Sequence, residues 1–201
     1  DFIPLVTGIG AVYVHWGGER NALQQLNGGV VDNIDALKYE GTIFYRKKGV
    51  PMPHNGFTRT DLLLEKAKAL EYPMEYTRTG YQHSDTKDRP KNLENVTNSI
   101  SVEYAEPYQV RWTYDEASGV YKRFRGGTPE IDATTSQQVA ASVVIVMETQ
   151  SRVLNQDYIS VDVTGSGDMR VYQQGGVISG RWEKNDAESA RLIFYDGDRQ
   201  E

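Results

Sequence analysis

The chain has 201 residues, of which 38% are hydrophobic, and a formal net charge of −6. This length suits one large domain or two small ones. The acidic balance argues against nucleic-acid binding, which depends on Lys and Arg neutralising phosphates. The absence of cysteine excludes disulfides, thiolate catalysis and cysteine-bound zinc. The chain contains no run of about 18 apolar residues, so no membrane-spanning helix is predicted. It also contains no motif that predicts a metal site or a cofactor.

The first part of the chain alternates strand and helix signals. Residues 11–14 predict a short strand, and 19–26 carry helix formers with their apolar side chains on one face. Residues 32–37 indicate a further short turn of helix, with Asp32 or Asn33 as its cap. Residues 42–45 predict a second strand. The clearest helix is predicted over 61–70, where leucine and alanine follow helical spacing.

In the second part of the chain, apolar residues recur with the period of two that is typical of β-strands. Polar residues dominate 76–98 and predict a linker or long loop. Apolar and polar residues alternate after residue 98, and the more continuous apolar run at 139–147 predicts a central strand. Gln174-Gly175-Gly176 predicts a tight hairpin. Short strands at this spacing, without helices between them, indicate an antiparallel sheet, sandwich or partial barrel.

These signals predict an α+β fold. Part of an N-terminal α/β domain is expected over residues 1–75, a linker or long loop over 76–98, and a mostly antiparallel β domain over 99–201. The chain begins in an apolar segment without an initiator Met, and it stops just after a turn signal. We therefore expect it to be a piece of a longer protein, whose other parts carry any signal or anchor.

Two histidine segments are the main candidates for a functional site. His15 lies at the exit of an apolar run, where α/β domains usually place their ligands. An imidazole there can bind an anion, act as a base or hold a metal. The alternative is a histidine that merely caps the strand beside a glycine turn. Asp35 is a nearby acidic residue that could orient the imidazole.

The second segment places His54 and Asn55 between a proline and a glycine. A polar imidazole and amide on a stiff loop can form the wall of a site, and they can equally be a surface turn. Arg46 precedes them and Arg59 follows, and both could hold a phosphate or carboxylate. The predicted ligand-binding residues are therefore His15, Asp35, Arg46, His54, Asn55 and Arg59, and no catalytic residue is assigned.

A family resemblance covers nearly the whole chain. Its motifs include Tyr13-Val14-His15-Trp16-Gly17-Gly18, Pro53-His54-Asn55, Trp112-Thr113-Tyr114-Asp115, Gly165-Ser166-Gly167, Gly180-Arg181-Trp182 and Phe194-Tyr195-Asp196. On these residues the chain resembles the YerB family of bacterial lipoproteins. One position departs from the pattern, because Glu130 stands where relatives usually have a histidine.

The resemblance implies an N-terminal α/β domain and a C-terminal mostly β domain, both of unassigned function. It implies a cell-envelope protein that a lipid anchor holds on the outer face of the cytoplasmic membrane. It also implies a Gly- and Arg-rich segment before Asp1 and a final strand after Glu201. That upstream segment would be a partner that completes the N-terminal domain and its site.

Three hypotheses follow for the function. The first is a protein that binds an anionic envelope ligand or a protein partner, with membrane contact only through the lipid anchor. The alternative is an enzyme of phosphoryl or glycosyl-phosphate transfer in envelope polymer metabolism. In that enzyme His15 would be the base and Arg46 the anion clamp, and the fragment would be inactive without the upstream arginines. The third is a purely structural module.

Overall fold

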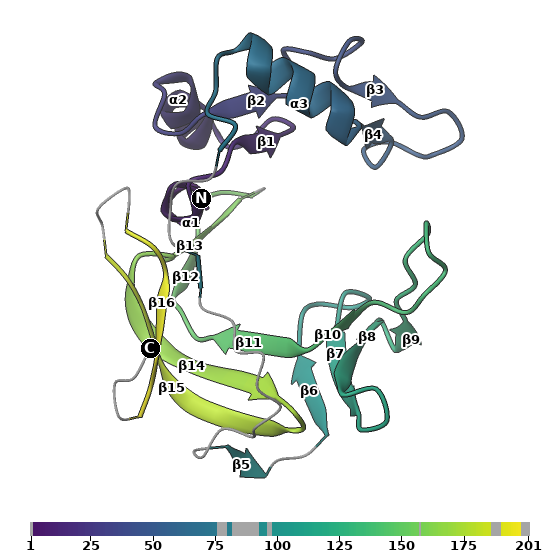
Figure 1. The fold of residues 1–201 in the computed structure, drawn as a ribbon, viewed down its shortest axis with the longest axis vertical. Coiled ribbons are helices and arrows are strands. Elements are labelled where there is room, and N and C mark those ends of the chain that lie inside the picture. The colour runs from purple at the N-terminus through teal and green to yellow at the C-terminus, as the bar shows by residue number, and fades with distance from the viewer. Residues whose placement is uncertain are drawn as a thin grey trace. The chain divides into compact units, whose positions relative to one another are not determined.

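A computed structural model of the chain describes residues 2–75, 80–81, 93–95, 98–156, 158–185 and 190–197. The described chain is mostly β, with three short helices and several sheets (Figure 1). It divides into two compact units. The first unit comprises 1–82, 150–165 and 184–192, and the second comprises 83–149, 166–183 and 193–201. The α+β arrangement and the domain boundaries expected at 75 and 99 stay predictions.

The first unit opens with a helix that the sequence analysis did not predict. Helix α1 spans Ile3–Ile9 and ends at Gly10, whose φ of 73° is left-handed and whose N–H donates to the Val6 carbonyl at 3.0 Å. The helix packs closely against a later segment, because a Cβ at Gly8 would lie 2.7 Å from the Ala190 carbonyl oxygen. The apolar start of the chain is therefore a packed helix.

Strands β1 (Tyr13–His15) and β2 (Asn33–Asp35) pair in parallel, with helix α2 (Arg20–Asn27) between them in the chain. The strand and helix expected over 11–14 and 19–26 are thus present with slightly shifted bounds. Glu19 caps α2 by accepting a hydrogen bond from the Asn21 N–H at 2.7 Å. This β–α–β segment carries both His15 and Asp35 at the carboxyl ends of its strands.

The helix expected over 32–37 is wrong, because this segment forms β2. Ile34 lies opposite Val14 in the parallel pair and is only 1% exposed. Burial of this β-branched side chain between neighbouring elements outweighs the weak capping signal before it. Local propensity is therefore overridden by packing.

Helix α3 (Thr60–Ala69) confirms the helix predicted over 61–70. The hydrophobic core of the first unit lies beneath it and contains Ile34, Ala36, Phe44 and Ala67. Strands β3 (Tyr45–Arg46) and β4 (Gly56–Phe57) form a short antiparallel pair. The strand expected over 42–45 is therefore shorter and later than predicted. A second hairpin, β12 (Ser151–Val153) with β13 (Ile159–Val161), also belongs to this unit.

The second unit consists of two antiparallel sheets (Figure 1). One has the strand order β10-β8-β7-β6, with β9 paired to β8, and the other has the order β11-β14-β15-β16, with β5 paired to β15. The first contains β6 (Ser99–Val102), β7 (Val110–Asp115), β8 (Val120–Arg125), β9 (Thr128–Pro129) and β10 (Ala140–Ala141). The second contains β5 (Glu94–Asn95), β11 (Val143–Met147), β14 (Gly165–Gln173), β15 (Gly176–Lys184) and β16 (Ile193–Asp196).

The core of the second unit joins these two sheets through Ile100, Tyr121 and Val144. The apolar run 139–147 does not form one central strand, so that prediction is wrong. It is divided between β10 and β11, each of which lies at the end of its sheet's strand order among the described residues. Burial alternates within β11, where Val144 is 9% exposed but Val143 and Ile145 are each 41% exposed. The run therefore behaves as an edge strand with one solvated face.

The hairpin predicted at Gln174-Gly175-Gly176 is confirmed between β14 and β15. Gln174 and Gly175 both have positive φ, at 49° and 71°, as a two-residue turn of the hairpin type requires. A Cβ at Gly175 would lie 2.8 Å from the ring of Tyr114, so this turn packs on the neighbouring sheet. Within the described part of the chain, no helix has the length and apolar character to cross a membrane.

Candidate binding site

His15 ends β1 and is only 8% exposed. Its Nδ1 lies 3.0 Å from the Gly17 carbonyl oxygen, and its Nε2 lies 3.2 Å from Oδ1 of Asn33. The Asn33 amide nitrogen donates to the carbonyls of Leu26 and Val31 at 3.0 and 3.1 Å, which fixes the amide with its oxygen toward the ring. Both ring nitrogens therefore face acceptor oxygens, and neither is directed toward an external ligand.

Asp35 is the register partner of His15 in the parallel pair. Its carboxylate accepts a hydrogen bond from the Leu37 backbone N–H at 2.9 Å, and Asn33 orients the imidazole instead. The sequence analysis considered Asn33 only as a helix cap. The signal that would have found it is the parallel register, which places residues 33 and 35 beside 13 and 15.

The structure brings Arg46 and Asn55 together in what we call the Arg46 corner, formed by Trp16, Glu40, Arg46 and Asn55. The guanidinium donates to both carboxylate oxygens of Glu40, at 2.8 and 3.4 Å, and to Oδ1 of Asn55 at 3.0 Å. Its carbon lies 4.2 Å from the centre of the Trp16 ring. The hydrogen bond from Arg46 holds the pKa of Glu40 below its ordinary value. Arg46 is thus a well-anchored side chain whose charge is already matched.

The two histidine segments meet through Trp16 and Gly56. A Cβ at Gly56 would lie 2.2 Å from the indole ring, so only glycine permits this contact. The indole also packs edge-on against Phe44, with ring centres 5.7 Å apart. His54 is exposed, and its backbone N–H donates to the Pro51 carbonyl at 3.0 Å. The sequence analysis did not anticipate the aromatic contact that joins the two segments.

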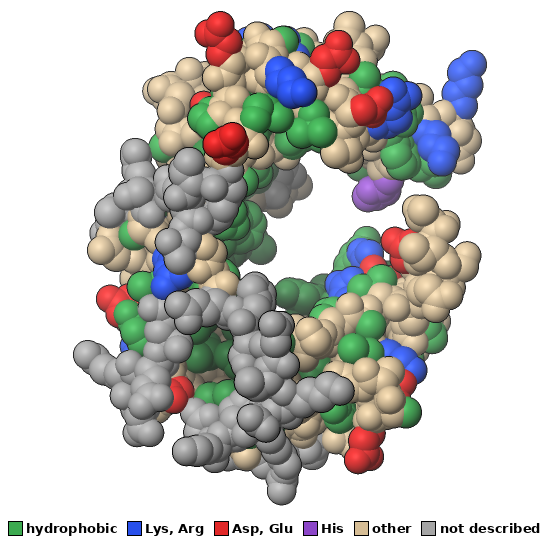
Figure 2. All heavy atoms as spheres, viewed as in Figure 1, with side chains coloured by type: hydrophobic (Ala, Val, Ile, Leu, Met, Phe, Trp, Pro, Cys, Tyr) green, Lys and Arg blue, Asp and Glu red, His purple; other side chains and the backbone are tan. Residues whose placement is uncertain are grey.

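Arg59 does not join the Arg46 corner. Its side chain is 60% exposed and forms two hydrogen bonds with Asp61, at 3.0 and 2.7 Å. Lys47 and Lys48 are exposed and take part in no ion pair within the described ranges. Figure 2 shows imidazole and Lys or Arg side chains gathered over the β3–β4 hairpin. The uncompensated positive charge of this hairpin therefore lies on its lysines rather than on its arginines.

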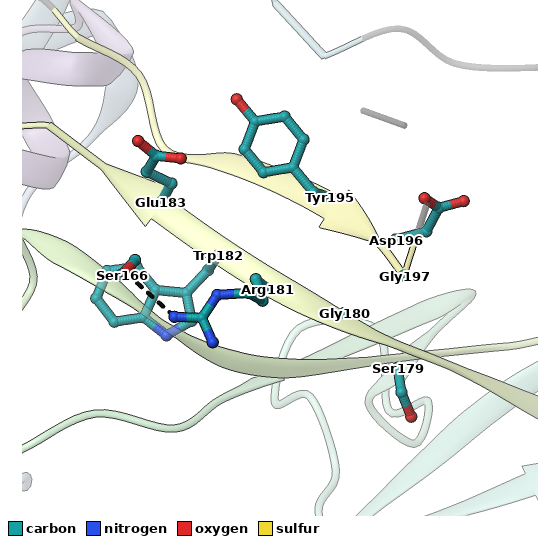
Figure 3. Close-up of a pocket in the computed structure, with 9 residues that line it drawn as sticks. All are labelled: Ser166, Ser179, Gly180, Arg181, Trp182, Glu183, Tyr195, Asp196 and Gly197. Carbon is teal, nitrogen blue, oxygen red and sulfur yellow. Dashed lines mark hydrogen bonds between the residues drawn. The ribbon is translucent and has the colours of Figure 1, made fainter. Parts of the chain in front are cut away.

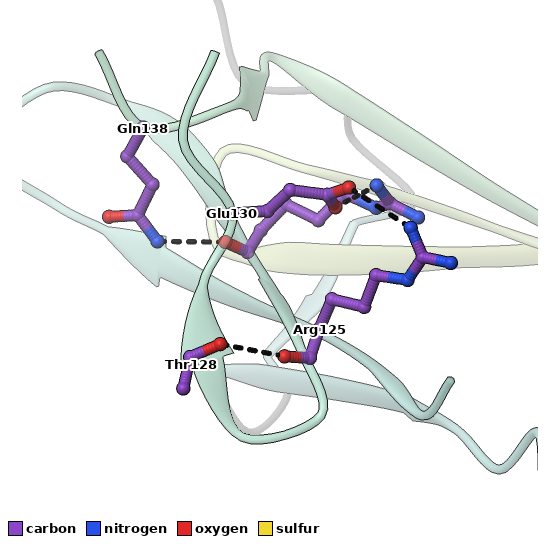
Figure 4. A network of polar contacts seen from close by, with 5 residues as sticks. Arg125, Thr128, Glu130 and Gln138 are labelled. Atoms are coloured by element: carbon purple, nitrogen blue, oxygen red, sulfur yellow. Dashed lines mark hydrogen bonds and ion pairs between the residues drawn. The ribbon is translucent and has the colours of Figure 1, made fainter. Parts of the chain in front are cut away.

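Glu130 belongs to a separate polar network in the second unit (Figure 4). Its carboxylate forms an ion pair with Arg123 and lies 3.8 Å from the guanidinium of Arg125. Gln138 donates to the Arg123 carbonyl at 2.8 Å and ties the same strands together. Glu130, which stands where relatives usually have a histidine, thus neutralises neighbouring arginines. Across the described residues, no three His, Asp or Glu side chains converge as a metal site requires.

Comparisons with known proteins give a consistent family. Residues 1–73 match the N-terminal domain, and residues 100–201 the C-terminal domain, of the family described as "Protein of unknown function (DUF3048)". The chain is 26% identical over 189 residues to a Bacillus subtilis (strain 168) protein named "Putative lipoprotein YerB". That match covers 91% of this chain and 56% of the relative.

The crystal structure of the YerB protein from Bacillus subtilis superimposes with a TM-score of 0.77 at 22% sequence identity, and this likeness shows the fold alone. The match covers 98% of this chain and 65% of that chain. The described chain therefore corresponds to somewhat more than half of its longer relatives. Because both domains match in order and together cover most of its length, the chain belongs to the DUF3048 family, as a YerB-like member.

Proposed function

We propose that the chain is the ligand-binding part of a lipid-anchored bacterial envelope protein, which captures an anionic group outside the cytoplasmic membrane. The name of the Bacillus subtilis relative, which describes a lipoprotein, supports this location. The ligand class rests on the loop between β3 and β4, residues 47–55, which we call the basic loop. The proposal keeps the expected region and changes the residues that contact the ligand.

The observation that carries the proposal is that the basic loop has positive charges without ion-pair partners among the described residues, while the ends of the loop are held by the Arg46 corner. Lys47 and Lys48 have no ion-pair partner in the described part of the chain, and His54 is exposed on the same loop. Two ammonium groups and an imidazole N–H suit a phosphate or carboxylate group. An anion reaching this loop meets donors that are already close together in the chain.

The Arg46 corner holds the two ends of this loop together. Arg46 joins Asn55, at the far end of the loop, to Glu40 and to the Trp16 ring. A loop held at its base loses less conformational entropy on binding than a free one. We therefore assign Arg46 and Asn55 to positioning, and Lys47, Lys48 and His54 to contact with the ligand. His15 and Asp35 stabilise the strand pair that carries Trp16.

The geometry favours binding over catalysis. The transfer enzyme considered above would use His15 as a general base, and a general base needs a ring nitrogen within reach of the proton that it takes from the substrate. Both nitrogens of His15 face the acceptor oxygens of Gly17 and Asn33. The anion clamp of that hypothesis, Arg46, has its charge matched by Glu40.

A protein partner is the second candidate, favoured by exposed apolar side chains on the same hairpin. Met52 is 74% exposed and Tyr45 is 42% exposed. Aromatic and methionine side chains beside basic ones are typical of partner-binding surfaces. An acidic protein segment would use the lysines as well as these side chains.

The direct test is a titration of the chain with inorganic pyrophosphate, followed by backbone amide shifts. We expect saturable shifts at residues 46–55 that weaken as salt is added. Replacing Lys47 and Lys48 together by Gln removes two charge-assisted contacts and should weaken binding by about tenfold or more. The matched control is Lys68→Gln, which removes an exposed lysine of α3. Equal affinity in the double variant and the control would reject the anion site.

The location needs its own test with the full-length protein. Protease added to intact bacteria should digest a protein held outside the cytoplasmic membrane. Digestion that requires disruption of that membrane would contradict the proposed location.

A further inference from the structure

A pocket of about 980 Å³ lies in the second unit, and it is lined by none of the residues of the candidate binding site. It is formed by the start of β14, the second half of β15 and the end of β16 (Figure 3). The motifs Gly165-Ser166-Gly167, Gly180-Arg181-Trp182 and Phe194-Tyr195-Asp196 each contribute to its lining. Three segments that are well separated in the sequence therefore converge on one cavity.

The open face of the pocket carries a regular row of polar groups. Burial alternates along the second half of β15, so Ser179, Arg181 and Glu183 all point to its exposed face. Successive members of this row are about 6.6 Å apart along the strand. Tyr195 is the register partner of Arg181 in β16, so both side chains leave the sheet on the same face, with the guanidinium directed toward Ser166 of β14 (Figure 3). The row thus offers a hydroxyl, a guanidinium, a carboxylate and an aromatic ring together.

The arginine in this row is held in place and its charge is compensated. Its Nη1 donates to Oδ1 of Asp168 at 2.9 Å, and its Nη2 lies 3.3 Å from Oγ of Ser166 (Figure 3). The carboxylates of Glu183 and Asp196 also line the pocket. Among the described residues that line the pocket or contact its arginine, negative groups therefore outnumber positive ones, which disfavours phosphates and carboxylates. Its ligand differs in charge from the one proposed for the basic loop.

With anionic ligands disfavoured, the polar groups of the pocket best fit a neutral molecule with many hydroxyl groups. A hydroxyl can donate to the Glu183 carboxylate and accept from the Arg181 guanidinium, and the serine hydroxyls can do either. The half-buried Tyr195 ring gives an apolar surface with a polar tip, which suits the C–H face of a sugar ring. A simple cation is disfavoured, because Arg181 occupies the middle of the row. We propose that this pocket binds a neutral saccharide.

The test uses the 201-residue chain and two neutral probes, the tetramer of β-1,4-linked N-acetylglucosamine and maltotetraose. We expect at least one to cause saturable amide shifts at residues 179–183 and 195–197. Tyr195→Ala should weaken its binding tenfold or more, and Tyr195→Phe should retain most of it because the ring remains. Glu183→Gln should weaken binding several-fold. Glu116→Gln, at an exposed turn outside the pocket, is the matched control and should not change affinity.

Three results would overturn the proposal: no shift at the pocket with either saccharide, equal affinity in Glu183→Gln and Glu116→Gln, or saturable binding of pyrophosphate or putrescine at these residues instead. Glu183→Gln keeps the test decisive should Tyr195→Ala fail to fold, because the Glu183 side chain is exposed. The double lysine variant of the basic loop should bind the saccharide normally. The two binding proposals can therefore fail separately.

Discussion

The indole of Trp16 packs so closely against Gly56 that a Cβ at position 56 would lie 2.2 Å from the ring. This contact joins the segment that follows β1 to the first residue of β4. The same ring lies 4.2 Å from the Arg46 guanidinium carbon. The aromatic side chain, and not either histidine, thus holds the two segments together and positions the base of the basic loop.

Gly56→Ala should destabilise the first unit through this contact. The added methyl group must displace the indole or the β4 backbone, and overpacking of this kind costs about 1–3 kcal/mol. The free energy of unfolding, measured with urea, should fall by that amount. Gly80→Ala is the control, because nothing lies within 4 Å of a Cβ there. Similar losses in both variants would show that the Trp16 contact is not the cause.

Arg46→Gln should lower stability in a pH-dependent way. The hydrogen bond from Arg46 lowers the pKa of Glu40 in the folded chain, so the pair contributes stability above the unfolded pKa of that carboxyl. This contribution is lost as the pH falls through the folded pKa, which lies below the ordinary value of a glutamate. The stability gap between the natural chain and the variant should therefore narrow from pH 7 to pH 3. A gap that stays constant would assign the whole effect to the Trp16 contact.

Tyr121→Phe should alter the response of the chain to alkaline pH. Burial raises the pKa of the Tyr121 hydroxyl, and Tyr114 and Tyr172 add to the shift. A raised folded pKa means that the stability from this group is present below about pH 10 and is lost as the pH rises through the folded value. Urea unfolding between pH 8 and 11 should show a smaller alkaline loss for Tyr121→Phe. Tyr104→Phe, at a residue that is 58% exposed, should behave like the natural chain.

The elements predicted best are those with a strong local signal. Helix α3 has apolar spacing, and the β14–β15 turn needs two residues of positive φ, one of which is glycine. Strand β2 and the division of residues 139–147 were not predictable in this way. Ile34 and Val144 become buried only when distant strands pair, so their structure depends on partners that one segment cannot show.

In the candidate site, too, residue types could be predicted from local patterns, but their contacts with distant side chains could not. Sequence patterns drew attention to Arg46 and Asn55, because an arginine after an apolar run and an amide on a stiff loop are unusual, and the structure brings these two side chains into contact. They did not show that Glu40 would match the arginine's charge, or that Asn33 would engage the His15 ring. Both facts depend on which side chains face each other. A pattern in sequence identifies a reactive type of residue, but its partners decide whether that residue is available.

Gly180→Ala should be the most damaging small substitution in the second unit. A Cβ at this position would lie 2.0 Å from the Tyr195 carbonyl oxygen, which belongs to the neighbouring strand and cannot move without breaking the β15–β16 pairing. We expect a loss of about 3 kcal/mol or more. The indole N–H of Trp182 donates to the Glu148 carbonyl at 2.9 Å, and its NMR signal reports on the same sheet. That signal should shift or broaden in Gly180→Ala and stay unchanged in Gly197→Ala, where nothing lies within 4 Å of a Cβ. An unchanged signal and stability in Gly180→Ala would mean that β16 does not pair with β15 as described.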